Sequence, residues 1–224
     1  MHPRDVAASY DRIADTWNSE AFSRSDGIEQ HERALAFVAH GRQALDIGCG
    51  CSGRFIDLLA GRGFEVEGVD LSARMIELAR RRHPRVTFHH ADIREWNPRG
   101  HYDFISAWDS IWHLPLRDHE GVLSRILGML APGGVCIFTA GGLDAPGEKV
   151  DAAMGVPMYY STLGIPGTLA VIDESDCVCR HLEYDQPPEL HVFMVAQRRG
   201  EASNAPSQPR GPTPPSSGSA ASPP

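Results

Sequence analysis

The sequence contains a single lysine, Lys149, and no cluster of basic residues that could follow a nucleic-acid backbone. Its formal net charge is −8, whereas proteins that hold polyphosphate chains carry a concentrated positive surface. The three consecutive arginines at residues 80–82 are better explained as the end of a helix. There the helix dipole favours positive charge, and His83 and Pro84 stop the helix. We therefore expect no nucleic-acid partner.

Long apolar runs and a disulfide framework are also lacking. No apolar run approaches the roughly 20 residues of a membrane span, so we expect no membrane partner. The five cysteines are an odd number, and the polar segment at residues 1–10 does not resemble the apolar part of a secretory signal. These features predict a reduced, cytoplasmic setting. The pairs Cys49/Cys51 and Cys177/Cys179 are better explained by a glycine-rich loop and by one face of a strand, so no metal site is expected.

The middle of the chain alternates between short apolar runs and amphipathic segments. We predict strands at residues 43–47, 64–69, 85–89, 102–107 and 135–140, separated by helices at 52–60, 72–82 and 116–130. The Ala-Pro-Gly-Gly segment at 131–134 is expected to stop the last of these helices. This alternation is typical of βαβ units. Two further strands, 177–184 and 190–197, have so short a link that they must be antiparallel neighbours. The sequence therefore predicts an α/β, Rossmann-like three-layer sandwich, with a seven-stranded, mostly parallel sheet and an antiparallel C-terminal hairpin.

The segments around this unit differ in composition. Helices are expected at 6–17 and from Ser25-Asp26 to about 40, so residues 1–42 are interpreted as a helical cap and 43–199 as the catalytic domain. Residues 141–160 are rich in Gly and Pro and predict irregular structure. A helix, kinked at Pro166, is expected over 161–175. Residues 200–224 contain few apolar side chains and predict a disordered tail.

The most informative segment is the loop after the first predicted strand. Gly48, Gly50 and Gly53 allow a tight turn and a close approach to a ligand, and free amides at the following helix start favour an anionic group. Asp70, at the end of the second strand, can accept hydrogen bonds from both hydroxyls of a ribose. Because the same glycine spacing occurs in NAD-binding proteins, the loop predicts a nucleotide cofactor without choosing which one.

Two further carboxylates favour a positively charged cofactor. Asp46, just before the glycines, would repel a pyrophosphate but attract the ammonium or sulfonium of S-adenosylmethionine. Asp92, after the third strand, suits an adenine amino group. No Tyr-x-x-x-Lys pair supports a short NAD-dependent oxidoreductase. That enzyme is the alternative prediction, together with a non-catalytic regulatory module that binds S-adenosylmethionine.

Five short segments together resemble the class I S-adenosylmethionine-dependent methyltransferases. They are Leu45–Gly50, Val69–Ser72, Ala91–Ile93, Tyr102–Ile105 and Leu130–Gly134, within a resemblance that extends from about Val6 to Arg199. The family's sheet has seven strands, the last of them antiparallel. The loop Gly48-Cys49-Gly50-Cys51 departs from the family pattern because it is not followed by a third glycine at the alternate position, for which Gly53 is the candidate replacement.

The resemblance also implies roles for the motif residues. The amides around Gly48, Cys49 and Gly50 would hold the methionine part of S-adenosylmethionine. Asp70 and Leu71 belong to the ribose motif. The side chain of Asp92 and the amide of Ile93 would take the adenine. Trp17, in a lid formed by residues 10–22, would fold over the cofactor by analogy.

The segment Trp108–Pro115 follows the fourth predicted strand, where open α/β sheets place their ligands. Methyl transfer is an in-line displacement that requires aligned reactants, and a base when the acceptor is a hydroxyl or an ammonium. His113 and Asp109 are the candidate bases. Alternatively, His113 packs against the cofactor or caps the next helix, and Asp109 anchors the substrate. Trp108 and Trp112 are candidates to shield the sulfonium or to stack on the substrate, or they are core residues.

The acceptor itself is less well defined by the sequence. Tyr159 and Tyr160 are candidate walls of the substrate site, while His191 is interpreted as structural or as a distant wall. The loop at 108–115 lacks the Asn-Pro-Pro-aromatic sequence of relatives that methylate base or glutamine amines. Together with the acidic charge, this predicts methyl transfer to a small molecule by a monomer or homodimer. An oxygen, nitrogen, sulfur or carbon acceptor stays open.

Overall fold

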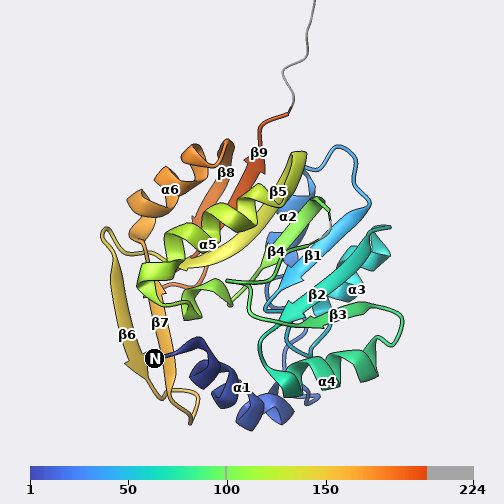
Figure 1. Cartoon of the computed structure of the whole chain (residues 1–224), viewed down its shortest axis with the longest axis vertical. Coiled ribbons are helices and arrows are strands. Elements are labelled where there is room, and N and C mark those ends of the chain that lie inside the picture. The colour runs from blue at the N-terminus through green and yellow to red at the C-terminus, as the bar shows by residue number, and fades with distance from the viewer. Residues whose placement is uncertain (99, 201–224) are drawn as a thin grey trace, which may run out of the picture.

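The computed structural model describes residues 1–98 and 100–200, so the predicted disordered tail lies outside the described residues apart from Gly200. A sheet of seven strands, in the order β3-β2-β1-β4-β5-β9-β8, forms its centre (Figure 1). The strands are β1 (Gln43–Ile47), β2 (Glu65–Asp70), β3 (Thr87–His90), β4 (Tyr102–Ala107), β5 (Leu130–Gly141), β8 (Cys177–Tyr184) and β9 (His191–Arg198). The pairs among β1 to β5 are parallel, and β9 runs antiparallel to both β5 and β8. The predicted mostly parallel sheet with an antiparallel C-terminal hairpin is confirmed.

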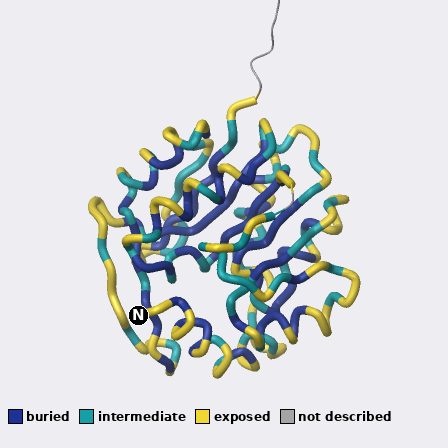
Figure 2. Tube along the Cα trace, viewed as in Figure 1, coloured by how far each residue is buried: buried dark blue, intermediate teal, exposed yellow. Residues whose placement is uncertain are grey.

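Helices cover both faces of this sheet. They are α1 (Pro3–Trp17), α2 (Ile28–Leu35), α3 (Arg54–Gly61), α4 (Ala73–Arg82), the 3₁₀ turn η1 (Ile111–His113), α5 (Leu116–Gly128) and α6 (Gly164–Glu174). One apolar cluster joins α5 and α6 to one face, and another joins α2 and α3 to the other. The adjacent β4 residues Phe104 and Ile105 are both fully buried, as expected for a sheet covered on both sides. Figure 2 shows the central strands as a buried layer between partly exposed helices.

The strand order creates a crevice between the loops that follow β1 and β4. From β1 the chain continues to β2 and β3 on one side, and β4 then lies on the other side of β1. The loops after β1 and β4 therefore diverge from neighbouring strands at the carboxyl edge of the sheet. Ligands of open α/β folds bind at such a point.

A second sheet of two strands is the main departure from the predicted elements. Within residues 141–162, β6 (Gly147–Asp151) pairs antiparallel with β7 (Met158–Thr162), beside α1 in Figure 1. The prediction of irregular structure at 141–160 was wrong. Polar and apolar residues do not alternate along β7, because the consecutive residues Met158 and Tyr159 are both buried. Tertiary contacts hold it, including a bond of 2.8 Å from the Ser9 hydroxyl to the Pro157 carbonyl.

Several helix boundaries also differ from those predicted. α6 begins at Gly164 because residues up to Thr162 belong to β7. Pro166 then lies in the first turn, where its missing N–H interrupts no helical hydrogen bond. α2 ends at Leu35 rather than near residue 40, because the Phe37 and Val38 amides form i→i−3 bonds and the chain turns toward β1.

The expected caps and stops were partly wrong as well. Gly27, not Ser25 or Asp26, is the N-cap residue of α2, and the Asp26 carboxylate pairs with Arg54 instead. Residues 131–134, predicted as the stop of a helix, lie in the irregular first part of β5, where the pairing with β4 shifts register. Within the described ranges, no helix is both long and apolar enough to cross a lipid bilayer.

Candidate ligand-binding site

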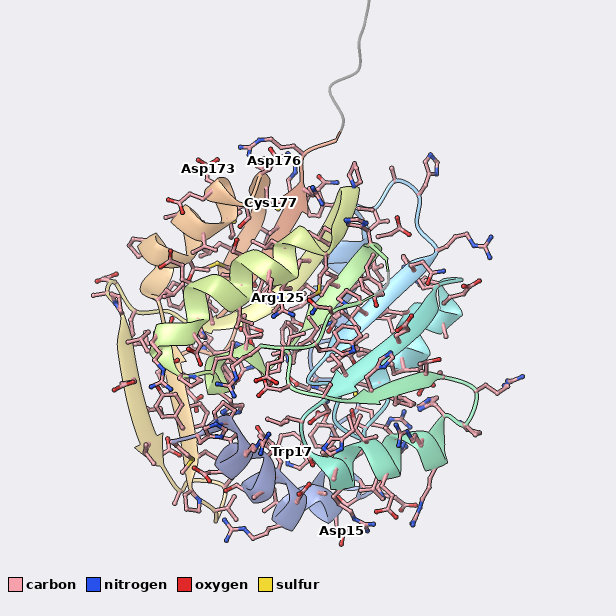
Figure 3. The ribbon with its side chains drawn as sticks, viewed as in Figure 1. Asp15, Trp17, Arg125, Asp173, Asp176 and Cys177 are labelled. Carbon is pink, nitrogen blue, oxygen red and sulfur yellow. The ribbon has the colours of Figure 1, made fainter. Side chains whose placement is uncertain are left out.

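A cavity opens at the carboxyl edge of the sheet, where the loops after β1, β2, β3 and β4 meet. It encloses about 1150 Å³, its mouth included. α1 covers it and contributes Val6, Tyr10 and Trp17 to the lining. Figure 3 shows Trp17 on the inner side of α1 and Asp15 on the outer side. The N-terminal helix therefore forms one wall of the site, as the lid prediction requires.

Most of the residues predicted for the site line this one cavity. They are Trp17, Gly48, Cys49, Gly50, Asp70, Leu71, Asp92, Ile93, Trp108, Asp109 and His113. Asp46, Trp112, Tyr159 and Tyr160 lie outside the lining. Their predicted roles, like those of the lining residues, stay predictions that the geometry below makes specific.

The glycine loop approaches the cavity with its backbone. Gly48 and Gly50 have φ values of +67° and +53°, which L side chains rarely adopt. A Cβ on Gly48 would lie 2.3 Å from Cβ of Ser110, whereas a Cβ on Gly50 would meet no protein atom within 4 Å. The glycine at position 50 therefore leaves open space in the cavity, where a ligand fits against bare backbone.

The N–H groups of this loop already have acceptors in the protein. Those of Gly48 and Cys49 donate to the Val69 carbonyl at 2.8 and 3.2 Å, and that of Gly50 donates to the Asp70 carboxylate. The methionine-holding role predicted for these amides would therefore require shared hydrogen bonds. Cys51, in the same loop, packs against Ala14 of α1. Gly53 takes φ +69° at the start of α3.

Asp70 is held in one orientation at the end of β2. One carboxylate oxygen accepts from the Gly50 amide at 2.9 Å and the other from the Ser72 amide at 2.8 Å. Burial raises the pKa of Asp70, and these amide bonds offset part of the rise. Each carboxylate oxygen has a second lone pair, so the side chain can still accept two hydroxyl groups from a ligand in the cavity.

Asp92 lines the adjoining part of the cavity, beyond β3. Its carboxylate accepts hydrogen bonds from Nε and Nη2 of the Arg94 side chain, and the bond from Nη2 is 2.7 Å long. Burial raises the pKa of Asp92, but the hydrogen bonds and charge of Arg94 outweigh it, so the pKa lies below its usual value. Asp92 is therefore an ionised acceptor with a fixed orientation, as a role in binding an adenine amino group requires.

Asp46 lies behind the loop rather than in the cavity wall, with only 3% of its surface exposed. Burial raises its pKa to about 7, against the lowering effects of Ser106 and Arg54. Ser106 is its cross-strand neighbour and also bonds to Nε2 of His31 at 3.0 Å. Burial lowers the pKa of His31 to about 3. The predicted direct contact between Asp46 and a cofactor stays a prediction, and Asp46 is not among the residues that line the cavity.

His113 and Tyr10 meet at the opposite end of the cavity. Nδ1 of His113 faces the Tyr159 carbonyl at 2.7 Å, so this nitrogen carries the proton. Nε2 therefore accepts from the Tyr10 hydroxyl at 2.8 Å. Burial lowers the pKa of His113 to about 4. Nε2 also accepts from the Trp112 indole N–H at 3.2 Å. The predicted role of His113 as a base stays a prediction, and it would require both donors to leave Nε2.

Asp109 has an unusual backbone and a buried partner. Its φ is +50°, and its amide donates to the Thr139 hydroxyl at 2.8 Å. Its Oδ1 accepts from Nε2 of His191 at 3.0 Å, and Nδ1 of His191 donates to Asp185. His191 was interpreted as structural or as a distant wall, whereas it directly contacts a candidate site residue.

The remaining aromatic candidates surround His113. The Trp112 and Tyr160 rings lie 6.2 and 5.0 Å from the His113 ring, centroid to centroid. The Tyr159 hydroxyl accepts from the Leu116 amide and donates to Glu148. Trp108 lines the cavity but is only 3% exposed. These residues form the support of the site, and their contact with a substrate stays a prediction.

Three residues that line the cavity were not singled out as site residues. Tyr10 was predicted as a helical residue and as the first residue of the lid, without a role of its own. Arg54, directly after the glycine loop, pairs with Asp26 at 3.2 Å and lies over the Phe55 ring. Ser110 has a buried hydroxyl without a partner among the described residues, next to Gly48. The position of Arg54 directly after the glycine loop could have identified it from the sequence, because a cation there suits a ligand that carries a carboxylate.

A family model described as "Methyltransferase domain" matches residues 44–134. A trans-aconitate 2-methyltransferase from Delftia acidovorans is 38% identical over 192 residues, which cover 73% of this chain and 70% of that protein. Another from Methylobacterium radiotolerans is 39% identical over 126 residues, covering 53% of this chain and 47% of that protein. The chain thus spans about half the length of several curated relatives it matches.

Solved structures share the fold at low sequence identity. A 1,6-didemethyltoxoflavin-N1-methyltransferase from Burkholderia thailandensis has a TM-score of 0.66 and 20% identity, over 88% of this chain and 87% of that one. An amino pentose methyltransferase from Micromonospora echinaspora, bound to SAM, has a TM-score of 0.62 and 19% identity, over 82% and 95% of the two chains. At this identity the likeness shows the fold alone.

Proposed function

This chain belongs to the class I S-adenosylmethionine-dependent methyltransferases, and from that premise we propose that it transfers the methyl group of S-adenosylmethionine to a small-molecule acceptor. The observation that carries the proposal is the Asp70 carboxylate, fixed by the amides of Gly50 and Ser72 at the wall of the cavity. An acceptor held in this way suits the two hydroxyls of a ribose. The open space at Gly50 gives the rest of the cofactor room beside the loop.

The residues present fit S-adenosylmethionine along its length. Asp92 would accept from the adenine amino group, and Asp70 from the ribose. Arg54 and the buried Ser110 hydroxyl, both beside the loop, would bind the methionine carboxylate. Bound S-adenosylmethionine supplies a methyl group that its sulfonium already activates. The protein's remaining task is to place the acceptor in line and to exclude water.

Residues at the β4 end would perform that task. Tyr10 and Trp17 of α1 cover the cavity, and Trp108 walls it from the sheet side. Asp109 offers an oriented carboxylate that can hold an acceptor or take a proton from it. Neutral His113, oriented by the Tyr159 carbonyl, keeps Tyr10 in place. Residues 1–42 would thus act partly as a lid, through α1.

Calorimetric titration with S-adenosylhomocysteine, and with NAD as the comparison, tests the proposal. We expect S-adenosylhomocysteine to bind with a Kd in the micromolar range and NAD not to bind. Incubation with S-adenosylmethionine and acceptor compounds should then give methylated products, after subtraction of background hydrolysis. Binding of NAD alone would support the oxidoreductase alternative. Binding of S-adenosylhomocysteine without transfer to any acceptor would support a regulatory module.

A further inference from the structure

The strand order determines which end of the cavity receives the acceptor. Asp92, Asp70 and Gly50 follow β3, β2 and β1, which are neighbours in that order. The adenine, ribose and methionine parts proposed above therefore run along the sheet edge toward β4. The next lining residues beyond β1 are Asp109 and His113. An acceptor in line with the sulfonium thus lies beside Asp109.

A buried ionic network fixes the Asp109 carboxylate. His191 donates from Nε2 to Asp109 and from Nδ1 to Asp185, and Gln30 also donates to Asp185 at 2.9 Å. Because both ring nitrogens face carboxylates, both carry protons and His191 is an imidazolium. Burial alone would lower the pKa of His191, but its bonds to Asp109 and Asp185 outweigh this and raise it.

The exposed charge of this network lies on the cavity side. The side chains of His191 and Asp185 are 6% and 4% exposed, whereas that of Asp109 is 32% exposed. Two carboxylates and one imidazolium carry one net negative charge. The rings of Trp108 and Trp112 also pack on His191, and neither adds a charge. A ligand at this end therefore meets the Asp109 carboxylate, whose counter-ion, the His191 imidazolium, is shared with Asp185.

Within the part of the chain that the structure describes, no unassigned cation balances this charge from the cavity wall. Among the described residues of the lining, Arg54 is the only arginine or lysine; it is paired with Asp26 and is already assigned above to the methionine carboxylate. The imidazole of His113 is neutral, since its Nε2 lone pair faces Tyr10. Lys149, whose ammonium pairs with Asp151, is outside the lining. A carboxylate acceptor would therefore be repelled by the net negative charge that remains on the Asp109–His191–Asp185 network.

We propose that the acceptor is an amine, held through its ammonium form by Asp109, with His191 and Asp185 as positioning residues. This inference rests on the proposed methyl transfer. The ammonium loses one proton to solvent water through Asp109, which frees the nitrogen lone pair. The lone pair forms the new N–CH₃ bond as the C–S bond breaks, and that bond's electron pair stays on sulfur. The products are the N-methylated ammonium and S-adenosylhomocysteine.

The test compares matched amines and carboxylates on protein saturated with S-adenosylhomocysteine. Calorimetry with benzylamine, cyclohexylamine and putrescine, against benzoate, cyclohexanecarboxylate and trans-aconitate, should give at least tenfold lower Kd values for the amines. Asp109→Asn should abolish this preference while leaving the Kd of S-adenosylhomocysteine within twofold. Asp151→Asn, which removes a nearby carboxylate outside the lining, should keep it. Transfer from S-adenosylmethionine should yield N-methylated products by mass spectrometry.

The outcomes separate this inference from the function on which it rests. Equal or tighter binding of the carboxylates, formation of a methyl ester, or an amine preference that survives Asp109→Asn would overturn the amine assignment. The amine assignment would also be overturned if none of the amines bound to protein that does bind S-adenosylhomocysteine. Failure to bind S-adenosylhomocysteine at all would instead contradict the proposed function. The wild-type comparison needs no variant, so a folding defect in Asp109→Asn would not hide the answer.

Discussion

The hydroxyl of Tyr10 lies 2.8 Å from Nε2 of His113, and this contact joins α1 to η1 across one end of the cavity. Because Nδ1 of His113 donates to the Tyr159 carbonyl, Nε2 holds the lone pair and Tyr10 is the donor. These two hydrogen bonds thus connect the N-terminal helix, the loop after β4 and, through Tyr159, the β6–β7 sheet. The cover and the acceptor end of the site are coupled through this bond.

Tyr10→Phe should loosen this cover while keeping its apolar wall. Loss of one buried hydrogen bond costs about 1 kcal/mol, so we expect S-adenosylhomocysteine to bind about fivefold more weakly. Calorimetry measures the Kd directly. Tyr184→Phe is the matched control, since it removes a hydroxyl bonded to the Gly142 carbonyl outside the cavity. An equal loss of affinity in both variants would argue against a closing role for Tyr10.

Gly48→Ala should destabilise the fold and prevent cofactor binding. Gly48 and Gly63 both have positive φ values, +67° and +89°, which cost a side chain about 1–2 kcal/mol. Only at Gly48 would the new Cβ also collide with Ser110, at 2.3 Å, while Gly63 has open space. The melting temperature should therefore fall further in Gly48→Ala than in Gly63→Ala, and only Gly63→Ala should bind S-adenosylhomocysteine normally. Similar behaviour of the two variants would contradict the loop geometry.

His113 should contribute to acid sensitivity. Burial lowers its folded pKa to about 4, below an unfolded value of about 6.5. The unfolded chain therefore binds the proton first, so the contribution of His113 to stability is present above pH 6.5 and is lost as the pH falls toward 4. Between pH 7 and 4.5, the melting temperature of His113→Gln should fall less than that of the wild type. The exposed His40→Gln should follow the wild type, and parallel curves for all three proteins would refute the assignment.

His191 should have the opposite pH dependence. Its folded pKa is raised because its hydrogen bonds to Asp109 and Asp185 outweigh burial. Its contribution to stability is therefore full below about pH 6.5 and is lost as the pH rises through the folded pKa. NMR should show that the His191 ring titrates above pH 6.5 in the wild type and at lower pH in Asp185→Asn. A ring that titrates at the same pH in both proteins would contradict the imidazolium assignment.

The sheet and the nucleotide end of the cavity were predictable because their signals are local. The parallel strands alternate with amphipathic helices along the chain, and Gly48, Gly50 and Asp70 stand at or just after the ends of β1 and β2. The positive φ values of the glycines and the placement of Asp70 at the cavity follow from that pattern. Sequence spacing alone was sufficient to place these residues at one edge of a parallel sheet.

The acceptor end depends on contacts between distant residues, which no local pattern encodes. His191 and Asp109 are 82 residues apart, and Tyr10 and His113 are 103 apart. The β6–β7 sheet was missed because α1 and η1 bury its β7 strand and remove the alternation on which strand prediction relies. Tyr159 and Tyr160 were predicted as walls of the substrate site, and that role stays a prediction. Their position beside His113, outside the cavity lining, required the tertiary structure.

The most direct test of the account is the affinity of Asp70→Asn for S-adenosylhomocysteine, measured by calorimetry beside Asp103→Asn. Asp103 also accepts two backbone amides, those of Arg42 and Gln43 at 2.8 and 3.0 Å, but it lies outside the cavity. Hydrogen bonds to a charged acceptor contribute about 1.5–3 kcal/mol, so Asp70→Asn should bind about 10- to 100-fold more weakly. Asp103→Asn should bind like the wild type. Unchanged affinity in Asp70→Asn would contradict the proposed cofactor site.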